Sequence, residues 1–150
     1  MDLSARLVQR TLRALDALAR VVPWRNEDST PEHLITGRRG EEEAYFYLRK
    51  LGYVMIARNY RSPRSRSELD LVGWDGDMLC FIEVKTRTTR DIKPAEMAVD
   101  SEKQRDLGHV SREFLRKIQG QPATRFDIVS VYFEPNQPTQ ITLFKDAFRV

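Results

Sequence analysis

Apolar side chains recur at helical spacing in three segments of the chain. In residues 3–22 they occupy one helical face and four arginines occupy the opposite face, which predicts an amphipathic helix. Residues 36–51 and 101–120 show the same spacing and predict two further helices. Ser101 and Gln104 match a capping box, so we expect the last helix to begin at Ser101.

Five shorter segments are rich in β-branched and aromatic residues, which favours strands. They are residues 53–60, 68–73, 78–85, 125–133 and 140–144. The dipeptide Asp75-Gly76 between the second and third segments is typical of a tight hairpin turn. The predicted order is therefore helix, helix, three strands, helix, two strands, with no internal repeat.

Residues 23–36 are polar, contain two prolines and lack periodicity, so we expect a linker there. The chain then divides into an N-terminal amphipathic helix with its linker (1–36) and a compact domain (37–150). The helix suits docking on its own domain or on a second copy in a homodimer. Arginine opposite leucine is also the pattern of helices that lie on a membrane surface, which is the alternative.

The composition limits the class of protein. Of the 150 residues, 41% are hydrophobic and 31% are charged, which excludes a mainly disordered or membrane-spanning chain. The single cysteine, Cys80, excludes an intrachain disulfide and a cysteine-based zinc site, and it fits a cytoplasmic protein. The net charge is only +3, but 19 of the 25 basic residues are arginine, whose planar group binds phosphate in a bidentate manner.

The hairpin turn sets which residues face each other. If Asp75-Gly76 forms a two-residue turn, Trp74 faces Asp77 across the hairpin. On this register Asp70 and Glu83 are diagonal neighbours, about 7–8 Å apart at the backbone. Their carboxylates would then converge on one ion.

Four polar residues share one face of the predicted hairpin: Glu68, Asp70, Glu83 and Lys85. Crowded carboxylates repel one another, and a hard divalent cation relieves that repulsion. Mg²⁺ takes one or two carboxylates together with waters and phosphate oxygens, and Lys85 adds a positive charge beside them. Metal-assisted hydrolysis of a phosphodiester is one interpretation. A solvated face of ion pairs is the other.

A basic stretch precedes the acidic strand and contains no acid. We expect a phosphate-binding rim there, although a solvated basic loop has the same composition. Lys103 opens the third predicted helix, where it contacts nucleic acid or is simply exposed. The candidate nucleic-acid-binding residues are Arg58, Arg61, Arg64, Arg66, Arg87 and Lys103.

Several motifs follow one another in a distinctive order. Asp70 is followed thirteen residues later by Glu83-Val84-Lys85. The other pieces are Gly37-Arg38-Arg39-Gly40-Glu41, Gly52-Tyr53, Ala57-Arg58-Asn59-Tyr60-Arg61, Lys103 and Arg125-Phe126-Asp127. This set resembles the YraN-like bacterial family within the PD-(D/E)XK nuclease superfamily. Ser67 and Ile92 depart from the family pattern, which usually has glycine at both places.

The resemblance implies a fold and a site. The fold is a restriction-endonuclease-like α/β domain, a mixed sheet flanked by helices. Asp70 and Glu83 would hold Mg²⁺ or Mn²⁺, together with the backbone carbonyl of Val84. Lys85 would position or activate the attacking water, and Glu41 would complete the site, as in similar Holliday-junction resolvases.

The sequence therefore predicts a metal-dependent endonuclease that acts on DNA, structured or branched DNA in particular. Two alternatives belong to other classes of function. One is a nucleic-acid-binding protein that has the nuclease fold without catalysis, because fold does not guarantee function. The other is an adaptor that acts through the N-terminal helix.

Overall fold

The structure, a computed structural model, describes residues 31–89 and 99–150. These residues form α2 (Glu32–Lys50), β1 (Val54–Arg61), β2 (Glu68–Asp75), β3 (Met78–Arg87), α3 (Ser101–Leu115), β4 (Thr124–Tyr132) and β5 (Gln140–Phe148). The predicted helix at 3–22 and the departure at Ile92 lie outside the described residues. Neither of the described helices has the length and apolar character needed to cross a membrane.

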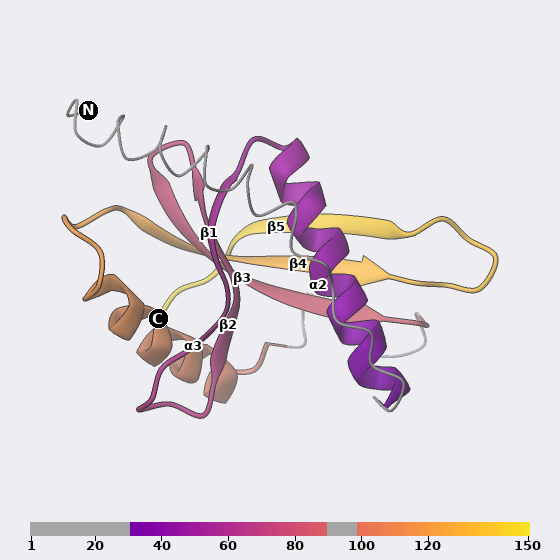
Figure 1. Cartoon of the computed structure of the whole chain (residues 1–150), viewed down its shortest axis with the longest axis horizontal. Helices are drawn as coiled ribbons and strands as arrows, with labels where there is room; N and C mark the ends of the chain where they lie inside the picture. The colour runs from indigo at the N-terminus through magenta and orange to yellow at the C-terminus, as the bar shows by residue number, and fades with distance from the viewer. Residues whose placement is uncertain (1–30, 90–98) are drawn as a thin grey trace.

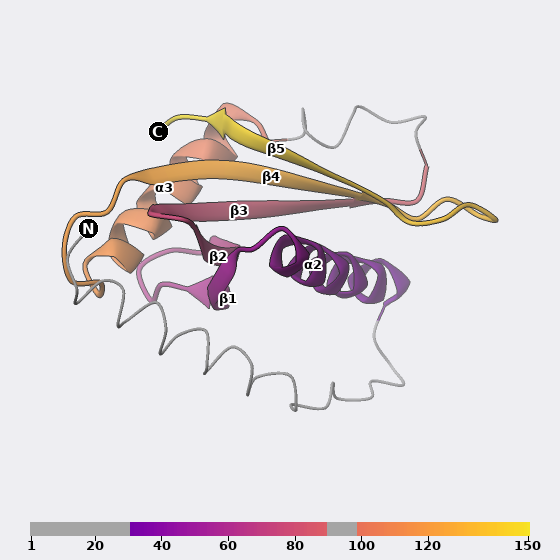
Figure 2. The same ribbon diagram turned by 90° about the horizontal axis from the view of Figure 1, so that it is seen from above.

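The strands form one mixed sheet whose spatial order follows the chain, β1-β2-β3-β4-β5. β3 and β4 are parallel, because α3 lies in the connection that carries the chain back, and the other neighbours are antiparallel. The two helices lie on opposite faces of the sheet, as Figures 1 and 2 show. The predicted α/β fold, a mixed sheet flanked by helices, is confirmed.

Each helix packs on a separate hydrophobic core. Side chains alternate along β3, so Cys80 and Ile82 join the core beneath α2 while Leu79 and Phe81 join the core beneath α3. Cys80 is fully buried on the face away from Glu83, as predicted. The helices contribute Ala44, Tyr45 and Leu48 to the first core and Leu107, Val110 and Phe114 to the second.

Helix α2 begins four residues earlier than the periodicity predicts, at Glu32 instead of Thr36. Its first turn is exposed, so it needs no apolar stripe and leaves no periodic signal in the sequence. Pro31 immediately precedes the helix and does not interrupt its hydrogen bonds. The predicted linker at residues 23–36 therefore overlaps the start of this helix.

The predicted hairpin turn is wrong by one residue. Asp75 pairs with Met78, so the two-residue loop is Gly76–Asp77 and not Asp75-Gly76. Trp74 consequently does not face Asp77. Gly76 has φ +60 at the first loop position, which is where a type II′ hairpin turn requires positive φ. The dipeptide signal identifies the hairpin but not which of two adjacent positions its glycine occupies.

The N-terminal cap of α3 also differs from the prediction. Asp100 is the capping residue, and its side chain accepts a hydrogen bond of 2.9 Å from the backbone N–H of Lys103. Ser101 is already helical, and the Gln104 side chain donates to the Val99 carbonyl. A carboxylate caps a helix at least as well as a hydroxyl. Asp100, the residue before the predicted capping box, is therefore the N-cap in place of Ser101.

Candidate metal and nucleic-acid site

Asp70 and Glu83 lie across the β2–β3 hairpin from each other. Leu71 pairs with Ile82, so Asp70 and Glu83 flank the last pair, at the end where the pairing of β2 with β3 stops. Moving a two-residue turn by one position shifts strand pairing by two residues, which keeps every side chain on its predicted face. Both carboxylates are buried, with Asp70 8% exposed and Glu83 4% exposed.

The oxygens of the two carboxylates have only some of the hydrogen-bond and ion-pair partners that they can accept. Asp70 Oδ2 accepts a 2.8 Å hydrogen bond from the Val84 backbone N–H. Glu83 Oε1 lies 2.6 Å from Lys85 Nζ and 3.5 Å from Lys103 Nζ. Glu83 Oε2 is buried and has no hydrogen-bond partner among the described residues. A buried carboxylate oxygen without a donor is unfavourable, so this atom has an unfilled place for a cation or a donor.

The protonation of Asp70 reflects this crowding. Burial, followed by the charge of Glu83, raises the pKa of Asp70 to about 8. The Val84 N–H and the charge of Lys103 act in the opposite direction and do not outweigh burial. Asp70 therefore holds a proton at neutral pH in the cation-free chain. A divalent cation would replace that proton.

Glu41 comes to the site from α2. Gly40 lets the helix approach β3 closely, since a Cβ at this position would overlap Oγ1 of Thr86. Burial raises the pKa of Glu41, and a hydrogen bond from the Asn59 side chain counteracts part of that rise. Glu41 also acts electrostatically on Asp70. The sequence did not single out Asn59, which has φ +48 within β1, a conformation that asparagine tolerates better than most residues.

Glu68 does not join the carboxylate pair. It forms a 2.6 Å ion pair with Arg61. Over residues 31–89 and 99–150, no three His, Cys, Asp or Glu side chains are grouped so that they could hold a metal ion. The arrangement is therefore a pair of carboxylates, Asp70 and Glu83, with Glu41 nearby. Two carboxylates are the number that Mg²⁺ takes when waters and phosphate oxygens complete its coordination.

A groove of about 710 Å³ lies between α2 and the end of β3. Its walls are the part of α2 from Glu32 to Glu41 and residues 84–89 at the end of β3. Lys85 and Glu41 both line it, whereas Asp70 and Glu83 are not among its lining residues. Its volume falls in the range of sites that enclose a small ligand.

The predicted basic residues occupy different environments. Arg61, Arg64 and Arg66 are exposed, but Arg61 pairs with Glu68 and Arg64 lies 3.3 Å from Glu113. These acids come from outside the basic stretch, so the sequence alone does not reveal the pairing. Arg58 instead stacks on the ring of Tyr45, with 4.6 Å from its guanidinium carbon to the ring centroid.

Arg87 lies at the groove and Lys103 at the carboxylate pair. Arg87 lines the groove, and its Nε is buried without a hydrogen-bond partner among the described residues. Its Nη1 donates to the Thr86 carbonyl over 3.0 Å. Lys103 at the start of α3 contacts Glu83 directly. The structure therefore brings Lys103 into the polar site itself.

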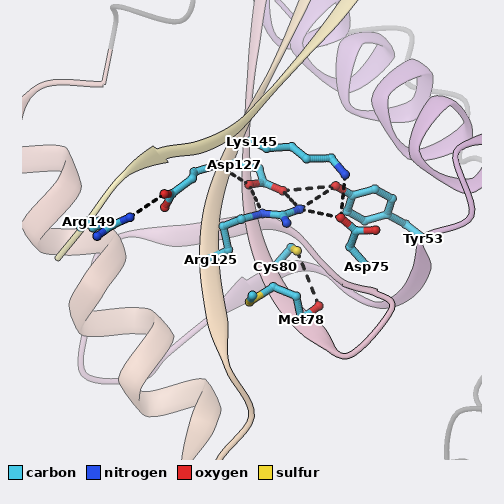
Figure 3. Close-up of polar contacts among 9 residues, drawn as sticks. Tyr53, Asp75, Met78, Cys80, Arg125, Asp127, Lys145 and Arg149 are labelled. Atoms are coloured by element: carbon cyan, nitrogen blue, oxygen red, sulfur yellow. Dashed lines mark hydrogen bonds and ion pairs between the residues drawn. The ribbon is translucent and has the colours of Figure 1, made fainter.

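A second polar cluster, shown in Figure 3, lies on the α2 side of the sheet and joins β2, β4 and β5. Asp127 is fully buried and accepts hydrogen bonds from Arg125 (2.7 and 2.9 Å) and from the Asp146 backbone N–H (3.0 Å). Arg125 also donates to Tyr53 (2.9 Å) and Asp75 (2.8 Å). These are hydrogen bonds within the protein, which identifies the cluster as a brace between strands. In the sequence, Arg125-Phe126-Asp127 is one piece of the ordered motif set, but the motif predicts no role for it.

Comparison with known proteins identifies relatives over most of the chain. The sequence profile of the uncharacterised protein family UPF0102 matches residues 40–131. A UPF0102 protein of Koribacter versatilis is 56% identical over 140 residues, which covers 93% of each chain. UPF0102 proteins of Solibacter usitatus and Herminiimonas arsenicoxydans are 48% and 40% identical, each over 65% of this chain and over 75% and 77% of their own.

Proposed function

The chain belongs to the uncharacterised protein family UPF0102, and we propose that it is a metal-dependent nuclease that hydrolyses phosphodiester bonds of DNA, structured or branched DNA in particular. One observation carries the proposal. The chain buries Asp70 beside Glu83, leaves Glu83 Oε2 without a partner among the described residues, and sets Lys85 Nζ 2.6 Å from the other oxygen of Glu83. A chain under selection for stability alone gains nothing from this arrangement.

The residues fit Mg²⁺ or Mn²⁺. The unpartnered oxygen of Glu83 and the crowded carboxyl of Asp70 are hard oxygen ligands, and two carboxylates leave positions for water and phosphate. The family resemblance adds the Val84 carbonyl to this set. When bound, such an ion polarises a phosphate oxygen and makes a coordinated water a stronger nucleophile.

The chain's own groups would orient the reacting atoms. The Lys85 side chain is 19% exposed and lines the groove with Glu41, so its ammonium would meet a water or a phosphate oxygen that enters there. A lysine at this place donates hydrogen bonds to the attacking water and holds it in line. Glu41, whose pKa is raised by burial, would accept a proton from that water.

The basic residues around the site would hold the DNA backbone. Arg61, Arg64 and Arg66 are exposed at one end of β1 and in the loop that follows it, and Arg87 lines the groove. Phosphate contacts of this kind give affinity without sequence preference. Arg58 is the exception, because its guanidinium stacks on Tyr45 within the domain.

The test is cleavage of branched and linear DNA with Mg²⁺ or Mn²⁺. We expect Glu83→Ala and Lys85→Ala each to lower the cleavage rate at least 100-fold, since each removes a group that acts on the reacting atoms. Asp77→Ala is the matched control, because Asp77 is an exposed carboxylate in the turn at the far end of the same hairpin. Cleavage that survives both site substitutions would refute the site.

One observation favours a second candidate, a nucleic-acid-binding protein without catalysis. The described residues hold no group of three metal-ligating side chains. In that case the protein would bind DNA with a steep dependence on salt and would cleave none under any divalent cation. The adaptor hypothesis concerns residues 3–22, outside the described residues, and stays a prediction.

A further inference from the structure

Two lysines share one oxygen of Glu83. Lys85 Nζ lies 2.6 Å and Lys103 Nζ lies 3.5 Å from Oε1. Lys85 follows Glu83 on the same strand, whereas Lys103 comes from the first turn of α3, within the β3–β4 connection. Two cations therefore gather on one oxygen of Glu83 while the other oxygen has no partner among the described residues.

The charges explain this gathering. Asp70 and Glu83 are buried side by side, and Lys103 acts electrostatically on Asp70 as well as contacting Glu83. In the chain without a divalent cation, the lysines supply the compensating positive charge. A divalent cation between the carboxylates would meet two ammonium groups of like sign, and repulsion at such distances is strong in a partly buried site.

Of the two lysines, Lys103 can move away from Glu83 more easily. Its contact with Glu83 is 0.9 Å longer than that of Lys85, and its side chain is 31% exposed against 19% for Lys85. Its backbone is fixed by the Asp100 cap, so only the flexible side chain has to move. A lysine displaced here remains beside the site, where the only new anion in a DNA complex is the phosphodiester.

We propose that Lys103 is an exchanging counter-ion: it neutralises Glu83 in the cation-free protein and moves to the phosphate of the DNA when the carboxylate pair takes up a divalent cation. This inference rests on the proposed function. It assigns Lys103 a role in the reaction beyond general attraction of the DNA backbone. It also predicts that Lys103 opposes cation binding while it favours cleavage, and no purely structural role has these two opposite effects.

The experiment compares Lys103→Met and Lys103→Arg with the wild type. Binding of Mn²⁺ alone is measured by calorimetry, and DNA cleavage is measured at saturating Mn²⁺. We expect Lys103→Met to bind Mn²⁺ five- to tenfold more tightly and to cleave 10- to 100-fold more slowly. Lys103→Arg keeps the charge and should resemble the wild type in Mn²⁺ affinity. Arg105→Met is the control, because Arg105 is an exposed cation on the same helix.

The possible results separate this inference from the proposed function. If Lys103→Met binds Mn²⁺ as weakly as the wild type or more weakly, or cleaves at the wild-type rate, this inference is wrong and the nuclease proposal stands. If the wild type binds no Mn²⁺ or cleaves no DNA, the nuclease proposal is wrong and the inference fails with it. A lower melting temperature with unchanged Mn²⁺ affinity would identify Lys103 as merely structural.

Discussion

At the scale of single residues, the notable feature is Asp70, whose burial is not fully compensated by its hydrogen bonds. Asp70 is buried next to another carboxylate, and the hydrogen bond that it accepts from the Val84 N–H does not outweigh its burial. Burial of a charged group without full compensation destabilises a protein. Such groups persist where function requires them, so the unfavourable environment of Asp70 is itself an argument for a site.

The first prediction concerns the pH dependence of stability without metal. Because the pKa of Asp70 is raised to about 8 in the folded chain, the unfolded chain loses this proton first as pH rises. The wild type should therefore lose free energy of unfolding between about pH 4 and pH 8. Asp70→Asn lacks this loss and should be more stable than the wild type at pH 8, by on the order of 5 kcal/mol.

Urea unfolding in EDTA, repeated from pH 4 to pH 9, measures this difference. Asp77→Asn is the control, because Asp77 lies exposed in the hairpin turn and its removal should leave the profile unchanged. Parallel profiles for the wild type and Asp70→Asn would show that Asp70 ionises normally in the folded chain.

At the scale of elements, the close approach of α2 to β3 brings Glu41 and Lys85 to the walls of the same groove. Gly40 makes that approach possible, because a Cβ there would overlap Oγ1 of Thr86. Gly37, one turn earlier in the same helix, has no atom within 4 Å of the place of a Cβ. Close packing against β3 therefore requires glycine at position 40, whereas position 37 has room for a side chain.

The second prediction uses these two positions. Gly40→Ala should destabilise the protein by about 1–3 kcal/mol and lower cleavage, because the helix must move away from β3 and take Glu41 with it. Gly37→Ala should stabilise it by up to about 1 kcal/mol, since alanine is the better helix former. Thermal unfolding measures both, and a Gly40→Ala variant as stable as the wild type would refute the packing argument.

Periodicity predicted the elements and missed their ends, for identifiable reasons. The exposed first turn of α2 carries no apolar stripe, so Glu32 gave no signal. The Asp75-Gly76 dipeptide located the hairpin but not the place of its glycine in the loop. The sheet face predicted for each hairpin residue is still correct despite the misplaced turn. The strand pairing moved by two residues, and side chains alternate with period two. The shared face of Asp70 and Glu83 was therefore predictable, whereas the register of the two strands was not.

At the scale of the whole molecule, the two faces of the sheet carry different polar clusters. The face toward α3 carries the carboxylate pair and Lys103. The face toward α2 carries the Arg125–Asp127 brace, whose members hydrogen-bond one another. Long-range contacts such as Lys103 to Glu83 and Arg64 to Glu113 join residues far apart in sequence. No local pattern reveals such pairs, which is why the sequence left the role of Lys103 open.

The third prediction distinguishes the Arg125–Asp127 brace from the site formed by the carboxylate pair. Asp127→Ala leaves Arg125 partly buried with fewer partners, so it should cost about 3–5 kcal/mol of the free energy of unfolding. The fraction that remains folded should cleave DNA at the wild-type rate, because Asp127 lies away from the carboxylate pair. Urea unfolding and cleavage per folded molecule measure the two effects. A variant of normal stability with lost cleavage would instead place Asp127 in the site.

The fourth prediction concerns salt. Removal of one cation that binds a phosphate should reduce the slope of log affinity against log salt by about 0.9 for duplex DNA. Arg66→Gln should show this reduction, whereas Arg61→Gln should show less, because Arg61 must first leave Glu68. Fluorescence anisotropy of labelled duplex DNA at several salt concentrations measures both slopes. Equal, unchanged slopes would mean that this exposed stretch does not touch the DNA backbone.

The most direct test of the account is a crystal of the protein soaked in Mn²⁺ and measured for anomalous scattering. We predict one strong peak between Asp70 and Glu83, within bonding distance of Glu83 Oε2, and its absence in Glu83→Gln. No peak at this pair at Mn²⁺ concentrations that saturate cleavage, or an unchanged peak in Glu83→Gln, would contradict the central claim that these two carboxylates form the metal site.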